Sequence, residues 1–207
     1  MKSVLILYPK LFNCYSKFSR KVEKIISSLG EVTLLFPCDP NLLIQRFHDE
    51  NLESTNIEHM KNWTKNDITH AIIFDDGEEF SEESNSLKLH NIPLRIITIK
   101  ITRVVNIKKE EQYQSMKSNP EYEYIGRGSR WGNPYSIFEI EELEEGEDPR
   151  DLVVSNFKYD FDNDKLFNLK KEEVFSLAGK RLGCFCKPLP CHGDILADFL
   201  NEWDDGK

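Results

Sequence analysis

The sequence predicts an α/β protein with a Rossmann-like, parallel-sheet N-terminal half and a smaller α+β C-terminal domain. Up to residue 101, short apolar segments alternate with segments of helical periodicity, which is the pattern of βαβ units. Beyond residue 119, glycines, arginines and cysteines concentrate in two motifs on either side of an acidic stretch. We therefore expect domains at residues 1–118 and 119–207, with an acidic insert at 139–151.

The N-terminal half contains segments of both periodicities in turn. Five apolar side chains of Lys17–Leu29 recur at helical spacing, and Gly30 follows, where a helix commonly ends. Pro37 stops one apolar segment, and Pro93 lies at the start of another, where a strand tolerates it. The expected strands are Val4–Tyr8, Val32–Phe36, Thr69–Phe74 and Leu94–Ile101, and the expected helices are Lys17–Leu29, Asn41–Asp49, Asn56–Trp63 and Ser81–His90.

Ligands of such sheets bind beyond the carboxyl ends of the strands. Here those ends carry Tyr8-Pro9-Lys10, Phe36-Pro37-Cys38 and Asp75-Asp76-Gly77. The half has no glycine-rich dinucleotide turn and no P-loop, which argues against a standard dinucleotide or nucleoside-triphosphate site.

The run THAIIFDDGEEFSEESNSLKLHNIPLRIITI, at 69–99, resembles the Rossmann-like nucleotide-sensing superfamily of lonely-guy phosphoribohydrolases and DNA-processing protein A. The strand, the Asp76-Gly77 turn and the Ile92-Pro93 approach to the next strand match, whereas Ser81-Glu82-Glu83-Ser84 replaces the usual Gly-Thr. The resemblance implies a nucleotide-like ligand near the turn, with Glu82 or Glu83 as a carboxylate nucleophile. The favoured alternative is that these acids only stabilise a helix N-terminus.

Charge and composition limit the partners and the compartment. The net charge is -9, and the acidic excess lies beyond residue 118, so general binding to nucleic acid is not expected. The acidic insert is expected to be a solvated loop. No apolar stretch approaches the roughly 20 residues of a membrane span, and the N-terminus lacks the pattern of a signal peptide. We therefore expect no membrane partner and a cytoplasmic protein, in the host cytoplasm if a phage encodes it.

Five cysteines, an odd number, argue against a disulfide framework. Cys14 and Cys38 are isolated in the sequence and are expected to be ordinary thiols. The other three cysteines, Cys184, Cys186 and Cys191, lie within eight residues of one another.

The first motif, YEYIGRGSRWGNPY at 122–135, combines glycines with arginines, a serine, an asparagine and aromatic rings. Glycines allow the backbone to approach a ligand, and successive free amides can form an anion-binding nest. Arginines offer forked donors that suit phosphate or carboxylate. The candidate binding residues are Tyr124, Gly126, Arg127, Gly128, Ser129, Arg130 and Asn133.

The second motif follows an expected strand, Arg181–Cys186, and begins an expected helix, Asp194–Trp203. A helix N-terminus favours anions and lowers the pKa of a thiol. In one interpretation Cys184, Cys186, Cys191 and His192 bind zinc, although the spacing is unusual and neighbouring ligands are awkward. In a second, Cys191 or His192 acts on a substrate, with Asp194 orienting it or accepting a proton. In a third, the cysteines only pack. The sequence favours a site of His192 and Asp194 with structural cysteines over a metal.

Both motifs, YIGRGSRWGNPY and LAGKRLGCFCKPLPCHGD, resemble an uncharacterised domain family of phages, bacteria and fungi. The family pattern is Y-I-G-R-G-S-x-x-G-N-P-[FY] followed by C-x-C-x-P-x-x-C-H-G-D, and it spans roughly residues 122–203. The resemblance implies a domain and a site without a named reaction.

The two motifs are expected to meet in space. The leading hypothesis is a phage-type enzyme, in nucleotide metabolism or anti-defence, that binds and processes a nucleotide, nucleoside or ADP-ribose-like molecule at its glycosidic or phosphate linkage. Arg127 and Arg130 would hold the anion, Asn133 would orient the ligand, and His192 with Asp194 would transfer protons. The alternatives are a non-catalytic binder of a nucleotide or a host protein, and a small module stabilised by zinc.

Overall fold

The computed structural model describes residues 1–140, 143, 146–167 and 169–206. The chain divides into two compact units, residues 1–100 with the segment that begins at Glu202, and residues 101–201. This division precedes the boundary expected after residue 118, because residues 103–106 form a strand of the second unit's sheet. Within the described residues, no helix has the length and apolar character that a bilayer span requires.

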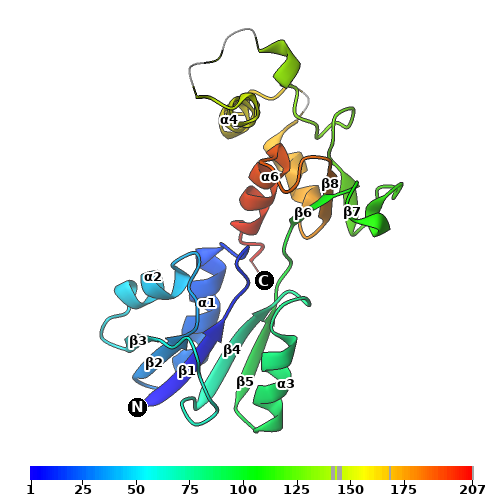
Figure 1. Ribbon diagram of the computed structural model, residues 1–207. Coiled ribbons are helices and arrows are strands. Elements are labelled where there is room, and N and C mark those ends of the chain that lie inside the picture. The colour runs from blue at the N-terminus through cyan, green and yellow to red at the C-terminus, as the bar shows by residue number, and fades with distance from the viewer. Residues whose placement is uncertain (141–142, 144–145, 168, 207) are drawn as a thin grey trace. The chain divides into compact units, whose positions relative to one another are not determined.

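The first unit is a five-stranded parallel sheet with helices in its crossovers, as the sequence predicted (Figure 1). The strands follow the order β3-β2-β1-β4-β5. Their bounds are Lys2–Leu7 (β1), Val32–Phe36 (β2), Thr55–His59 (β3), His70–Asp75 (β4) and Leu94–Thr98 (β5), and the helices are Tyr15–Ile26 (α1), Leu43–Glu50 (α2) and Ser81–Leu89 (α3).

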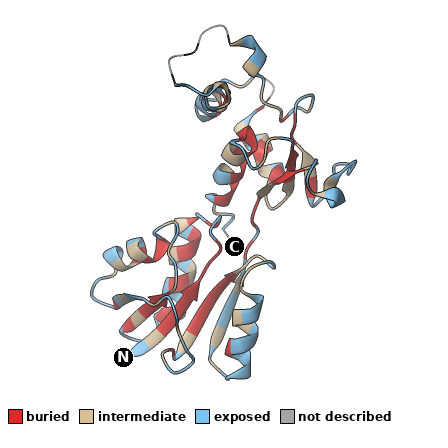
Figure 2. Ribbon diagram, in the orientation of Figure 1, coloured by how far each residue is buried: buried red, intermediate tan, exposed pale blue. Residues whose placement is uncertain are grey.

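The core of this unit lies on both faces of the central strands, where buried residues concentrate (Figure 2). On one face, Phe18 of α1 stacks on Phe74 of β4 with 5.2 Å between ring centroids. On the other face, Leu5 and Ile73 pack with Leu87 of α3. Alternate side chains of each strand thus serve opposite faces, as buried parallel strands require.

The prediction of one helix in the first unit was wrong. Residues 56–63 were expected to be helical, but Thr55–His59 forms β3, which pairs in parallel with β2. The segment is an edge strand with mostly polar residues, of which only Thr55 is fully buried. Because much of this edge strand is exposed, its sequence can be polar, and it lacks the apolar pattern that identified the other four strands.

The second unit contains a three-stranded parallel sheet in the order β6-β8-β7. Its core includes Ile125, Phe157, Leu182 and Leu196. The strands are Arg103–Asn106 (β6), Tyr122–Tyr124 (β7) and Arg181–Cys184 (β8), the α-helices are Pro149–Asp162 (α4), Lys171–Val174 (α5) and His192–Asn201 (α6), and short 3-10 turns lie at Glu111–Tyr113, Ile137–Glu139 and Phe175–Leu177.

The acidic insert expected at 139–151 is in part a helix start. Residues 141, 142, 144 and 145 lie outside the described residues. Asp148 caps α4 by accepting a 2.7 Å hydrogen bond from the Arg150 amide, Pro149 occupies the first turn, and Asp151 adds a carboxylate there. The end of this acidic run therefore stabilises a helix N-terminus rather than forming a loop.

Candidate functional site

Helix α6 begins at the second motif because the motif caps itself. The Gly193 amide donates to Cys191 Sγ over 3.4 Å, and Asp194 Oδ2 accepts from the Cys191 amide over 3.2 Å. This reciprocal arrangement is that of a capping box, with a sulfur in place of the usual hydroxyl. It places Cys191 just before the helix and His192 at its first residue.

Cys184 ends β8, and the chain returns from there to α6 through a short turn that contains Cys186. The buried Asn106, at the end of β6, fastens this turn. Its Nδ2 donates to the carbonyls of Phe185 and Lys187, and the Ile107 amide donates to the Cys184 carbonyl over 3.1 Å. The polar contacts of Asn106 thus hold the cysteine-bearing turn against the sheet.

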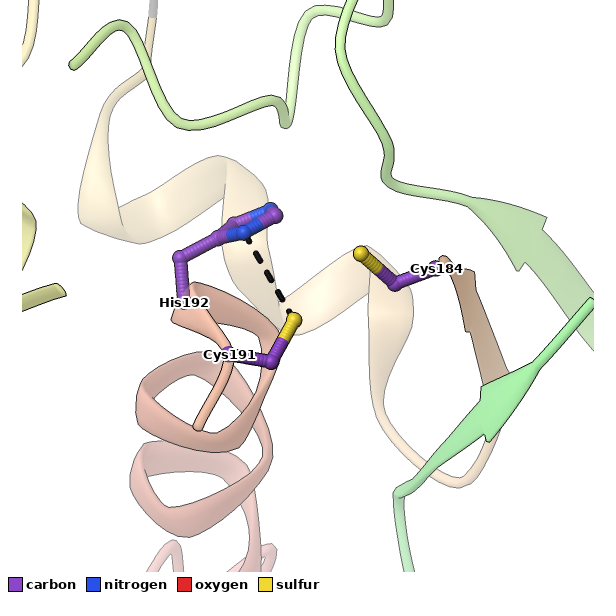
Figure 3. A group of neighbouring side chains, drawn as sticks. All are labelled: Cys184, Cys191 and His192. Atoms are coloured by element: carbon purple, nitrogen blue, oxygen red, sulfur yellow. Dashed lines mark hydrogen bonds between the residues drawn. The ribbon is translucent and has the colours of Figure 1, made fainter. Parts of the chain in front are cut away.

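Cys184, Cys191 and His192 converge in the interior of the unit (Figure 3). One ligand atom from each lies within 4.8 Å of the others, and the three residues are 3%, 1% and 5% exposed. Cys186 joins them, because its sulfur lies 3.5 Å from that of Cys184. All five cysteines are free thiols. The structure therefore contains a Cys/His cluster whose chemistry fits a metal ion.

The contacts of His192 identify its tautomer. Nε2 lies 2.9 Å from the Ile125 carbonyl, which can only accept, so Nε2 carries the proton. Nδ1 is then a lone pair, 3.7 Å from Cys191 Sγ. Burial lowers the pKa of His192, so the neutral imidazole is the favoured form in the fold.

The pKa values of the three thiols of the cluster, Cys184, Cys186 and Cys191, shift in different directions. The pKa of Cys186 lies far below its ordinary value, because the thiols of Cys184 and Cys191 donate to its thiolate and the charges of Arg150 and His192 favour it. The same hydrogen bonds, with burial, raise the pKa values of Cys184 and Cys191. Hydrogen bonds among the three thiols therefore shift their pKa values in opposite directions, down at Cys186 and up at Cys184 and Cys191.

The first motif forms a compact turn after β7. The Ser129 amide donates to the Gly126 carbonyl over 3.1 Å, and the Gly132 amide donates to the Ser129 carbonyl over 3.1 Å. Gly128 has φ +90°, a conformation that favours glycine. The Tyr124 hydroxyl closes the turn by donating to the Arg127 carbonyl over 3.2 Å.

A cavity of about 220 Å³ lies between the two motifs. From the first motif it is lined by Gly126, Arg127, Asn133 and Tyr135. Its other lining residues include Cys184, Phe185, Cys186, Cys191 and His192 of the second motif, Phe138, and Arg150 and Val153 of α4. The two motifs thus meet around one hollow whose walls combine guanidinium groups, sulfur atoms and apolar side chains.

Arg150 was not identified from the sequence, because it lies in the acidic run rather than in either motif. Its position in the first turn of α4 brings it into the wall of the cavity, and its charge acts on Cys186. The capping signal at Asp148 and the spacing of Val153, Phe157 and Phe161 would have located the helix that carries it.

The structure places Arg130 outside this cavity. Its guanidinium forms an ion pair with Glu173 at 2.5 Å and lies over the Trp131 ring. Arg130 instead lines a neighbouring cavity of about 370 Å³. Arg127 and Arg130 were expected to bind one anion together, whereas in the structure they line two different cavities.

The remaining candidate residues have local contacts of their own. Asn133 Nδ2 donates to the Val153 carbonyl over 3.0 Å, which ties the first motif to α4. Ser129 Oγ accepts from the Trp131 amide over 3.2 Å within the turn. Asp194, besides its capping contact, forms an ion pair with Lys187.

In the first unit, the polar residues at the carboxyl ends of the strands hold local turns. Asp39 receives a hydrogen bond from the Tyr8 hydroxyl and caps α2 through the amides of Ile44 and Gln45. Asp75 accepts from the Gly77 amide over 2.9 Å. Glu82 and Glu83, the alternative nucleophiles of the sequence analysis, lie in the first turn of α3.

Comparison with known proteins agrees with this division into two units. The family model of the "Minimal SLOG domain" matches residues 1–105, and that of a "Domain of unknown function (DUF4326)" matches residues 105–202, which include both motifs. The "Uncharacterized 12.4 kDa protein in nrdA-td intergenic region" of Enterobacteria phage T4 is 40% identical over 81 residues, covering 38% of this chain and 66% of that protein. No solved structure matches the chain. The chain therefore belongs to the minimal SLOG family through its Rossmann-like residues 1–105, and it carries a DUF4326 domain over residues 105–202.

Proposed function

We propose that the second unit binds a nucleotide-like small molecule through its phosphate and acts on the adjacent glycosidic or phosphate linkage. The observation that carries this proposal is the shared cavity, in which Arg127 and Asn133 lie in one lining with Cys191 and His192. The minimal SLOG domain of the same chain supports the ligand class, because such domains are associated with nucleotide-related ligands.

Two arginines supply the anion site. Arg127 and Arg150 both line the cavity, and the wall beside them contains the apolar side chains of Ile137, Val153 and Val154. Guanidinium groups bind phosphate through paired hydrogen bonds, and an apolar wall strengthens that attraction by lowering the local dielectric. In a chain of net charge -9, two arginines in one hollow favour a specific anionic ligand over a general polyanion.

The size of the cavity limits what it encloses. Pockets that surround a whole drug-sized ligand have about 300–1,000 Å³, whereas this one has about 220 Å³. We therefore place the phosphate and the neighbouring sugar inside, and the base at the rim. Phe138 and Phe185 line the cavity and are 87% and 47% exposed, so each presents a ring on which a base can stack.

A different observation favours a second candidate, non-catalytic binding. The groups expected to transfer protons are engaged elsewhere: His192 donates its Nε2 proton to Ile125, and Asp194 contacts Lys187 and the Cys191 amide. A site of this kind would hold a nucleotide, or present the bound form to a host protein, without turning it over. Zinc would stabilise such a module.

Titration calorimetry with ADP-ribose, 5′-AMP and adenosine tests the binding. We expect Arg127→Ala to weaken the two phosphate-bearing ligands about tenfold or more, since a charge-assisted hydrogen bond contributes about 1.5–3 kcal/mol. Arg130→Ala is the matched control, because Arg130 belongs to the same motif but pairs with Glu173 outside the cavity. Equal losses in both variants, or none in Arg127→Ala, would contradict the proposal.

Mass spectrometry of the same mixtures separates the two candidates. A product that forms with the wild-type chain and not in buffer alone supports processing. Tight binding without a product supports the non-catalytic module.

A further inference from the structure

The geometry points to a zinc ion bound by four protein ligands: Cys184, Cys186, Cys191 and His192. This site goes beyond the cluster of three buried residues, because it includes the half-buried Cys186 as the fourth ligand. The inference stands on the arrangement of these side chains and does not depend on the identity of the ligand in the cavity.

Two separations among the four groups, between Cys184 and Cys186 and between Cys191 and His192, match those of a tetrahedral zinc site. With Zn–S bonds of about 2.3 Å, tetrahedral geometry holds two sulfur ligands about 3.8 Å apart, and a sulfur and a nitrogen about 3.6 Å apart. Here the sulfurs of Cys184 and Cys186 are 3.5 Å apart, and Cys191 Sγ is 3.7 Å from His192 Nδ1. One ligand atom each of Cys184, Cys191 and His192 lies within 4.8 Å of the others. These distances are far from the roughly 2.05 Å of a disulfide.

The surroundings of the ligand atoms are those of a metal site. A histidine that binds zinc typically donates its other ring nitrogen to a carbonyl, which fixes the tautomer, and His192 does so to Ile125 over 2.9 Å. That bond leaves the Nδ1 lone pair 3.7 Å from Cys191 Sγ. The Gly193 amide donates to Cys191 Sγ, an outer contact that orients the sulfur. Three thiols and an imidazole lone pair suit zinc and exclude magnesium or calcium, which bind oxygen.

The unusual spacing C-x-C-x4-C-H is compatible with this site because of where α6 begins. In an extended chain, the side chains of adjacent residues point to opposite sides, so a neighbouring cysteine and histidine could not bind one metal ion. Cys191 precedes the helix and His192 opens it, and this change of backbone direction turns both side chains toward Cys184 (Figure 3). The start of α6 therefore allows the adjacent Cys191 and His192 to face the same site.

Four protein ligands leave no coordination position for water, which is the mark of a structural zinc. The ion would join the end of β8, the following turn and the start of α6, three segments that all line the cavity. Zinc would thus hold the cavity wall in place, and the ligand would contact Arg127 and Arg150 beside it.

The test is the metal content of the full chain, purified without a tag and measured by native mass spectrometry and elemental analysis. We expect one zinc per chain. Cys186→Ser and Cys191→Ser should lose it, whereas Cys14→Ser and Cys38→Ser, which alter the free thiols of the first unit, should keep it. Circular dichroism shows whether each variant is folded.

Replacement of zinc by cobalt in the wild-type chain tests the ligand set even if a ligand variant does not fold. We expect the visible spectrum of a tetrahedral cobalt site, with sulfur-to-metal charge transfer of the intensity that three thiolates give. A folded wild-type chain that binds less than stoichiometric zinc after reconstitution, with the three thiols as reactive as Cys38, would overturn the inference. An unchanged affinity in Arg127→Ala would contradict the proposed function alone.

Discussion

At Gly193 the site leaves no room for a side chain. An added Cβ would lie 2.4 Å from Ile125 Cδ1 and 3.1 Å from Val104 Cγ2, both in the packed interior. Because the Ile125 carbonyl also accepts the proton of His192, displacement of Ile125 would disturb the histidine. We expect Gly193→Ala to lower the free energy of unfolding of the second unit by about 1–3 kcal/mol, the usual cost of overpacking, as measured by urea denaturation.

Ile125→Val provides the control, because it removes the Cδ1 atom that the new methyl group would meet. The double variant should lose less stability than the sum of the two single variants. Additive losses would show that the cost of Gly193→Ala does not arise at Ile125.

At the same scale, sequence motifs identified only part of the cavity. Arg127, Asn133, Cys191 and His192 were candidates from the sequence, and the structure places all four in one lining. Arg150 could not be found in this way, because the fold, and not a motif, brings the start of α4 there. Which cavity each of the two arginines of one motif lines depends on side-chain packing, and that property has no sequence periodicity.

At the scale of elements, apolar content decided what the sequence could predict, since even the half-buried to exposed β5 was expected from its Leu94, Ile96 and Ile97. β2 coincides with its expected bounds, and β1, β4 and β8 overlap theirs, because each is buried and apolar. β6 and β7 were missed, since each is short and half polar. α4 was missed because the acidic run conceals an apolar repeat of every fourth residue. β6 and β7 form through pairing with the distant β8 rather than through a local sequence pattern.

The segment that begins at Glu202 belongs to the first unit, where its aspartates form ion pairs with Lys17 and Arg20 of α1. Lys17 Nζ pairs with Asp205 at 2.8 Å, and only 10% of the lysine side chain is exposed. We expect Asp205→Asn to destabilise the first unit by about 1–2 kcal/mol, because it leaves a mostly buried ammonium group without its charged partner. Lys17→Met should cost less, since it removes the charge and keeps the apolar stem. Denaturant titration measures both.

Asp162→Asn is the control for this comparison. It breaks the Lys158–Asp162 pair on α4, whose side chains are 60% and 50% exposed. An exposed pair of this kind contributes about 0.5 kcal/mol or less. A loss in Asp205→Asn no larger than in Asp162→Asn would mean that burial of Lys17 adds nothing to its ion pair.

At the scale of the whole molecule, the chain passes twice between two units that have separate cores, after residue 100 and after residue 201. The two family matches meet at residue 105, close to the first of these passages. The minimal SLOG domain and the motif-bearing domain are therefore distinct structural units of one chain.

Units with their own cores are expected to unfold separately, so calorimetry of the full chain should show two thermal transitions. Each transition can be assigned by a change confined to one unit. Asp205→Asn should lower only the transition of the first unit, because Lys17 and Asp205 both belong to it. A zinc chelator should lower only the other, because the four proposed ligands lie within residues 101–201 and metal binding adds directly to the stability of the fold that holds the metal. A single transition that responds to both changes would show instead that the units unfold as one, and that the zinc site and the Lys17 pair stabilise a common structure.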